Sequence, residues 1–309
     1  MNGKIRKIIV TGLLIVGVSR MFSQQPDTVP FPYIITLDSF VISEVQTGFS
    51  VRDFVTFVQN DTTFYEAFRN LRRINYYSSA TVRMFDKEHL SKAIYSNRTF
   101  QHAENNCRWM DFLFEVSTGD FFDKHDEMNY YTSKLFSYIF LYRDTMCNKI
   151  VETDNNESGG SELQKRKEQL KYLIFKPGQP VDGIPLIKNK MEIFSDEMAG
   201  YYDYDISIQR YATGIDCYVF SIKKKPEAKK GEDVIINELT TWFDKKTMEI
   251  VARNYSLSNF TSLYDFDVSM QVRLTTINGY RVPESIKYNG YFDITGKKPE
   301  VGSVQILIW

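Results

Sequence analysis

Residues 266–288, FDVSMQVRLTTINGYRVPESIKY, decide the fold of this chain. Apolar side chains occupy every second position from Phe266 to Leu274, and polar side chains occupy the positions between them. Because the side chains of a strand alternate between its two faces, this pattern predicts a β-strand with one apolar and one wet face. Asn278 and Gly279 follow, a pair that tolerates the positive φ angles of a two-residue turn. The stretch therefore predicts a tight hairpin whose apolar face needs a cover.

The same alternation extends over the C-terminal part of the chain. Seven strand-like runs joined by short turns lie between Tyr201 and Trp309. Short turns leave no room for the crossovers that parallel strands require, so we predict one antiparallel meander. Most of its strands are polar on one face, and the helical segments in the middle of the chain are the natural cover for the other face.

The N-terminal half mixes helices and strands. A run at 33–43 predicts a strand, and Ser50 opens a short helix. Thr63 and Glu66 have the spacing of a capping box, which predicts the start of a second helix. Residues 76–122 return to a period of two and predict three further antiparallel strands.

Residues 123–200 predict an insertion of helices and loops. A helix is expected over 130–143, and the many Pro and Gly residues of 177–187 favour a long ordered loop or a lid. We therefore predict a single domain from residue 24 to 309, made of N-terminal helices and strands (33–122), this insertion (123–200) and the C-terminal meander (201–309).

The first residues have the pattern of a secretory signal peptide. Three basic residues precede an uncharged apolar run over 8–18, and Ser23 suits the last position before cleavage. The eleven residues of this run are too few to span a bilayer as a helix, which takes about twenty. We predict a signal peptide over residues 1–23 and an exported mature chain.

Composition and charge limit the possible partners. The 309 residues are 43% hydrophobic and 25% charged, the balance of an ordinary globular domain. Removal of the predicted signal peptide takes away four bases and no acid, which leaves about five more acids than bases. This negative balance argues against nucleic acid as a partner.

The chain has three cysteines, an odd number without CxxC spacing: Cys107, Cys147 and Cys217. At most one bridge can form within the chain, and export would favour it. Since none of the three has a CxxC neighbour or a His partner, we predict instead that all three are small buried apolar residues.

Known enzyme motifs were not found in the sequence. It has no G-x-S-x-G elbow, P-loop, dinucleotide-binding glycine pattern or H-E-x-x-H. The loop that starts at Asp154 resembles a calcium loop but has Lys165 where a bidentate Glu is required. The histidines lie at no metal-binding spacing: His89, His102 and His125. We therefore predict a protein without metal or cofactor, and one that is not an enzyme.

Two stretches remain as candidate sites. DFFDKHDE, residues 120–127, gathers acidic side chains that could act as acid and base, although an acidic surface turn is the commoner outcome for such a stretch. EMAGYYDYD, residues 197–205, places three tyrosines beside a glycine where a loop enters the sheet. Tyr201, Tyr202 and Tyr204 are candidate ligand-binding residues that could rim a pocket mouth, with core packing as the default explanation.

A set of turn and strand residues carries a family resemblance: Trp242, Asp244, Lys246, Thr247, Gly279 and Pro283. In this pattern residues 201–309 resemble the lipoprotein-carrier superfamily, the Lol carriers and their relatives. The resemblance implies an α+β fold, a curved antiparallel sheet or incomplete barrel with helices packed on its concave face, which can hold acyl chains. NDTTFYEAFRNLRRINYY, residues 60–77, is similar to exported proteins of Bacteroidota and implies a Gram-negative envelope.

Three functions are compatible with these observations. The leading hypothesis is a non-enzymatic envelope protein, in the periplasm or at the periphery of the outer membrane. It would bind a lipid, an acyl chain or another apolar ligand in a half-barrel, and would associate peripherally with the outer membrane or an envelope protein. The first alternative is an integral outer-membrane β-barrel, suggested by the final residues SVQILIW. The second is a hydrolase of envelope glycans with carboxylates near Asp123 or at Asp203 and Asp205.

Overall fold

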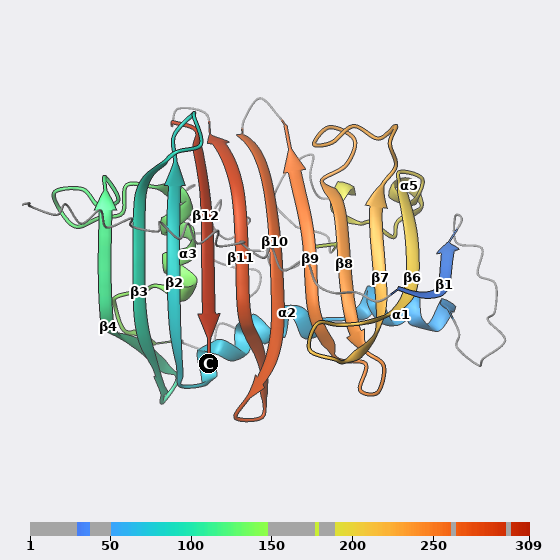
Figure 1. Cartoon of the computed structure of the whole chain (residues 1–309), viewed down its shortest axis with the longest axis horizontal. Helices are drawn as coiled ribbons and strands as arrows, with labels where there is room; N and C mark the ends of the chain where they lie inside the picture. Colours follow the sequence, from blue (N-terminus) through green and yellow to red (C-terminus); the bar gives the residue numbers. More distant parts are fainter. Residues whose placement is uncertain (1–29, 38–50, 148–176, 179–188, 261–263, 295–297) are drawn as a thin grey trace, which may run out of the picture.

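One antiparallel sheet of twelve strands dominates this computed structural model, which describes residues 30–37, 51–147, 177–178, 189–260, 264–294 and 298–309 (Figure 1). The strand order is β1-β6-β7-β8-β9-β10-β11-β12-β2-β3-β4-β5, and the sheet is open. The strands are β1 (Pro30–Leu37), β2 (Tyr76–Phe85), β3 (Ser91–Glu104), β4 (Cys107–Gly119), β5 (Met146–Cys147), β6 (Tyr202–Arg210), β7 (Asp216–Lys224), β8 (Ile236–Asp244), β9 (Ile250–Asn259), β10 (Tyr264–Ile277), β11 (Tyr280–Ile294) and β12 (Glu300–Ile308).

The predicted meander is confirmed, and it continues into the N-terminal strands. Strands β6 to β12 follow one another in sequence and in space, and every neighbouring pair is antiparallel. At its β12 edge the sheet takes up β2, where the backbone N–H of Tyr77 donates to the carbonyl of Trp309 at 2.9 Å. Both halves of the chain therefore share one sheet. The single domain over 24–309 stays a prediction.

The hairpin at 266–288 forms as predicted. Ile277 pairs with Tyr280, and the two residues between them have φ angles of 51° and 80°. The five alternating apolar side chains from Phe266 to Leu274 are buried. The register shifts between Arg273 and Leu274, opposite the proline of β11. Proline has no N–H to donate to a ladder, so a bulge beside it lets a long strand continue.

Short helices cover one face of the sheet, as predicted. They are α1 (Val51–Asn60), α2 (Thr63–Asn70), the 3₁₀ helix η1 (Leu71–Arg73), α3 (Tyr131–Phe140), the 3₁₀ helix η2 (Asn189–Met191) and α5 (Asp196–Ala199). In Figure 1, α1 and α2 cross behind the lower half of the strands, and α3 lies behind β12 and β2. We call the face on which they pack the covered face. The fold is α+β: an open antiparallel sheet with helices packed on one face.

Aromatic side chains make the contact between helices and sheet. The ring of Phe54 lies 5.5 Å from that of Phe243, and the ring of Phe136 lies 5.0 Å from that of Tyr288. The apolar stripes predicted for the first two helices are buried in this interface: Phe54, Val55, Val58, Phe64, Phe68 and Leu71. Packing of an apolar stripe stabilises such short helices, because helices of this length are marginal alone.

The prediction for the cysteines is wrong for two of the three. Cys107 and Cys147 form a disulfide that joins the start of β4 to β5. Cys217 is free and buried, as expected. The bridge forms because the chain after α3 returns to the sheet and pairs with β4, a contact that cysteine spacing does not encode.

Several sequence predictions lie outside the described residues or end differently. The signal peptide at 1–23, the loop at Asp154 and most of 177–187 are outside the described ranges. The helix predicted over 130–143 ends at Phe140.

None of the described helices has the length and apolarity needed to cross a membrane. Among the described residues, no three His, Cys, Asp or Glu side chains gather where a metal could bind.

Candidate functional site

A buried arginine lies on the covered face. Arg253 of β9 is on the same side of its strand as Tyr255 and Leu257, in phase with the apolar side chains. Its side chain is only 8% exposed. Burial lowers the pKa of Arg253, and the nearby Asp61 carboxylate opposes that shift. A charge in such surroundings is costly unless it is paired and hydrogen-bonded, so its partners indicate its role.

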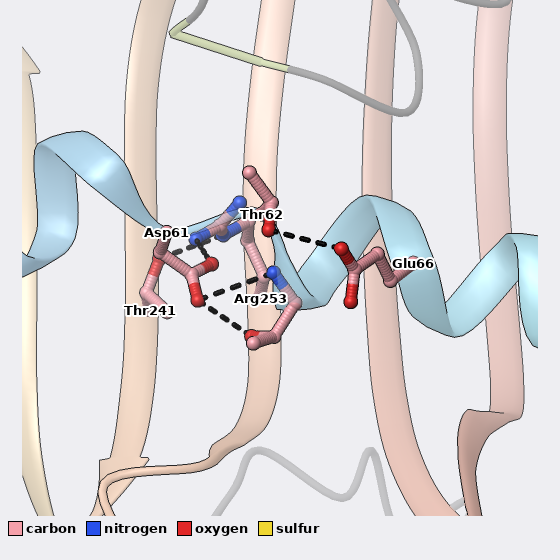
Figure 2. A network of polar contacts seen from close by, with 6 residues as sticks. Asp61, Thr62, Glu66, Thr241 and Arg253 are labelled. Carbon is pink, nitrogen blue, oxygen red and sulfur yellow. Dashed lines mark hydrogen bonds and ion pairs between the residues drawn. The ribbon is translucent and has the colours of Figure 1, made fainter.

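Asp61 is the counter-ion of this arginine and lies in the two-residue joint between α1 and α2 (Figure 2). Its Oδ2 is 3.6 Å from a terminal guanidinium nitrogen of Arg253, and its side chain is 2% exposed. Its other oxygen accepts hydrogen bonds from the backbone N–H of Thr63 at 3.3 Å and from the Thr63 hydroxyl at 2.6 Å. One carboxylate therefore couples the start of α2 to the sheet.

Two further contacts fix the guanidinium. Its Nε donates to the Thr241 hydroxyl of β8 at 2.9 Å, and its central carbon lies 4.5 Å from the ring centre of Phe64 on α2. We call Asp61, Thr63, Phe64, Thr241 and Arg253 the Arg253 site. The Asp61 carboxylate lies between the N-terminus of α2, which is the positive end of the helix dipole, and the guanidinium of Arg253. A negative charge at this position is stabilised by both.

The capping box predicted for Thr63 and Glu66 does not form at the start of α2. The helix does begin at Thr63, but its N-cap residue, Thr62, makes no side-chain capping bond. The Thr62 hydroxyl donates to the Glu66 carboxylate at 3.2 Å, and the Thr63 hydroxyl turns back to Asp61. Asp61 therefore accepts both Thr63 donors, and Glu66 pairs with Thr62 instead.

A second carboxylate accepts hydrogen bonds at the start of α3. Glu300 of β12 accepts from the backbone N–H of Tyr131 at 2.7 Å and of Thr132 at 2.9 Å, and from the Thr132 hydroxyl at 3.1 Å. It satisfies N–H groups that the first turn of α3 cannot pair internally. Both α2 and α3 therefore begin on a carboxylate, and in each case that carboxylate links the helix to the sheet.

An amide on β3 holds the segment after α2. The side-chain N–H groups of Gln101 donate to the carbonyls of Leu71 at 2.6 Å and Ile74 at 2.9 Å. The Tyr142 hydroxyl donates to the carbonyl oxygen of the same amide at 2.5 Å. Burial raises the pKa of Tyr142 to about 12, while the positive charge of Arg108 opposes the shift. The covered face thus attaches its helices through a few polar contacts set among aromatic rings.

The predicted tyrosines divide between core and surface. Tyr202 and Tyr204 are buried on the covered face, where the Tyr204 hydroxyl donates to the carbonyl of Ile193 and its ring lies 6.0 Å from that of Phe194. Tyr201 is 39% exposed at the entrance to β6. Core packing accounts for the first two, and the ligand-binding role of the three stays a prediction.

The predicted carboxylates occupy separate places. Asp123 accepts from the backbone N–H groups of His125 at 2.8 Å and Glu127 at 2.9 Å, which makes it the organiser of its own acidic turn. Asp203 and Asp205 alternate with the buried tyrosines of β6. Burial raises the pKa of Asp205. The two hydrogen bonds to Asp123 thus give the acidic turn at 120–127 a structural explanation.

Sequence reasoning missed the Arg253 site, although one signal was available. In the β9 pattern, arginine occupies a position where alternation requires an apolar side chain. A charged residue in phase with the core indicates a buried partner. Nothing local identifies Asp61 as that partner, because the contact arises only when α2 packs on the sheet.

Comparisons with known proteins leave the family open. No family model and no curated protein matches this chain. One similar solved structure is a DUF1329 family protein from Desulfovibrio piger, 12% identical over 82% of this chain and 88% of that chain, with a TM-score of 0.24. Another is a domain named for outer membrane lipoprotein sorting from Vibrio parahaemolyticus, 8% identical over 79% and 88%, with a TM-score of 0.25. At these TM-scores neither similarity supports a conclusion about fold, ligand or activity.

Proposed function

We propose that this protein is an exported, non-enzymatic component of a Gram-negative cell envelope that binds an acyl chain or another apolar ligand against the covered face. One observation carries the proposal: a continuous apolar and aromatic sheet face is buried, and the regular structure that covers it among the described residues is a set of short helices. Its buried rings come from neighbouring strands: Phe220, Phe243, Tyr255, Phe266, Tyr288 and Phe292.

The nature of the cover favours a ligand-binding role over a permanently closed core. The helices α1, α2 and α3 have ten, eight and ten residues, so their stability depends on contact with the sheet. An alkyl chain can replace such contacts, since each buried CH₂ contributes about 0.8 kcal/mol. Local opening of these short helices then gives a ligand access without unfolding of the sheet.

Two features support the export part of the proposal. The first residues have a signal-peptide pattern, with a basic start and a short apolar run. The Cys107–Cys147 disulfide suits an oxidising compartment, because thiols in the cytosol are kept reduced. The periplasm or the periphery of the outer membrane meets both conditions.

Native mass spectrometry of the chain purified from a Gram-negative periplasm tests the proposal. We expect an added mass of acyl-chain size that disappears on solvent extraction, and renewed uptake of a fluorescent fatty acid by the extracted protein. A bare mass together with no uptake of the fluorescent fatty acid contradicts the proposal.

A further inference from the structure

We propose that the Arg253 site recognises the carboxylate head of an acyl ligand, and that Asp61 occupies this site as an internal carboxylate until the ligand replaces it. This inference rests on the proposed function and names the ligand class: a long-chain fatty acid rather than an uncharged lipid. The juxtaposition that carries it is a buried guanidinium, a helix start and a threonine hydroxyl around one carboxylate (Figure 2).

The site has the donors that a carboxylate needs. Arg253 presents a planar fork of N–H groups, and its Nε is already positioned by the Thr241 hydroxyl at 2.9 Å. The first turn of α2 adds the Thr63 backbone N–H, which points at Asp61. A single arginine balances a single negative charge, so a carboxylate fits this buried position better than a doubly charged phosphate.

Asp61 fills the site incompletely. Its Oδ2 is buried, yet it makes no hydrogen bond, and its 3.6 Å distance to the guanidinium exceeds the 2.7–2.9 Å of a close arginine–carboxylate contact. The other oxygen is committed to Thr63, which ties the carboxylate to the joint between α1 and α2. A free carboxylate has no such tether and can reach hydrogen-bonding distance of the same guanidinium.

The surroundings suit the alkyl chain of the same ligand. The Phe64 ring lies over the guanidinium and 5.4 Å from the ring of Phe68, and it lies 6.3 Å from the ring of Tyr255 on β9. Val272 of β10 pairs directly with Arg253, and Leu239 and Phe243 lie two positions from Thr241 on β8; all three are buried. A head group bound at Arg253 therefore places its chain among apolar side chains of β8, β9 and α2. Release of Asp61 would free the α1–α2 joint at the same time.

Binding of palmitate and of hexadecanol to four proteins tests the inference: the wild type, Asp61→Asn, Arg253→Met and Arg273→Met. The alcohol matches the acid in chain length and lacks the charge. Asparagine keeps an acceptor for Thr63, so the start of α2 is retained. Arg273→Met is the matched control, because that arginine pairs with Glu284 on a half-exposed surface.

We expect the wild type to prefer palmitate, and we expect Asp61→Asn to bind palmitate about tenfold more tightly with hexadecanol unchanged. Arg253→Met should lose the preference for the acid, and Arg273→Met should behave as the wild type. Equal binding of acid and alcohol by the wild type overturns this inference but leaves the proposed function intact. Failure of all four proteins to bind either compound overturns both.

A measurement on wild-type protein covers the case in which a variant does not fold. Palmitate should raise the thermal unfolding midpoint more than hexadecanol does at equal concentration, because only the acid supplies an anion for Arg253. An equal rise with both compounds contradicts the inference, whatever the variants do.

Discussion

Breaking the Asp61–Arg253 pair should cost this fold much of its stability. At 3.6 Å and an effective dielectric constant of about 20, two unit charges attract by about 4 to 5 kcal/mol. Both side chains are nearly inaccessible, so removal of one leaves the other charged, buried and unpaired, which typically costs about 3–5 kcal/mol. We therefore expect Asp61→Asn to lower the free energy of unfolding by about 3 kcal/mol or more.

A double-mutant cycle isolates the contribution of the pair. Asp61→Asn, Arg253→Met and the double variant are unfolded with urea and followed by circular dichroism, and the coupling energy comes from the three differences. We expect a coupling energy of about 2–4 kcal/mol, since the double variant no longer buries an unpaired charge. Added salt should change it little, because buried charges are poorly screened.

An exposed pair on the same sheet provides the control. Arg210 and Asp216 are closer, with 2.9 Å between Nε and Oδ1, but their side chains are 59% and 51% exposed. Their coupling energy should be smaller and should fall as salt is added. If the Asp61–Arg253 cycle is additive, or resembles the exposed pair in its salt response, the buried pair does not hold the helices to the sheet.

Three further predictions follow from the sheet. Gly290→Ala should lower the free energy of unfolding in urea by about 1–3 kcal/mol, because the added Cβ would lie 1.9 Å from the Tyr288 hydroxyl. Gly200→Ala is the control in the same assay, since a Cβ at that position would have no atom within 4 Å. Replacement of Cys107 and Cys147 by Ser should cost about 4 kcal/mol, the chain-entropy value for their 40-residue separation, and an unchanged urea midpoint would contradict it. Burial raises the pKa of Tyr288 well above its ordinary value of about 10. The contribution of Tyr288 to the free energy of unfolding should therefore be complete below about pH 10, and it should fall at higher pH as this tyrosine ionises in the unfolded chain. Urea unfolding on both sides of about pH 10 measures this loss, and an unchanged free energy of unfolding would refute the prediction.

The local pattern of the sequence predicts most of the elements. The alternation from Phe266 to Leu274 specifies which side chains are buried, and Asn278 and Gly279 specify the turn, because both signals depend only on neighbouring residues. The order of the strands in the sheet does not follow from such local signals. Nothing near Tyr77 in the sequence indicates that its strand pairs with Trp309, since that pairing depends on the closure of a long loop between distant segments.

The contacts that hold the helices are the part that sequence reasoning missed. The spacing of Thr63 and Glu66 satisfied a local rule, yet a third residue, Asp61, competes for the same hydroxyl because it also faces Arg253. Local motifs assume that the cap has no tertiary partner. Here the tertiary partner decides which oxygen starts the helix.

The position of the ion pair is more informative than its strength. Replacement of a buried pair by apolar side chains of similar volume is often neutral or stabilising, so stability alone does not account for a charged pair on an apolar face. Asp61 lies in the joint between the two helices that cross the covered face, and Arg253 lies on the strand beneath that joint. An apolar contact at this point would hold the cover in place but could not exchange one anion for another. Only an ion pair makes the attachment of the helices depend on whether another carboxylate is present.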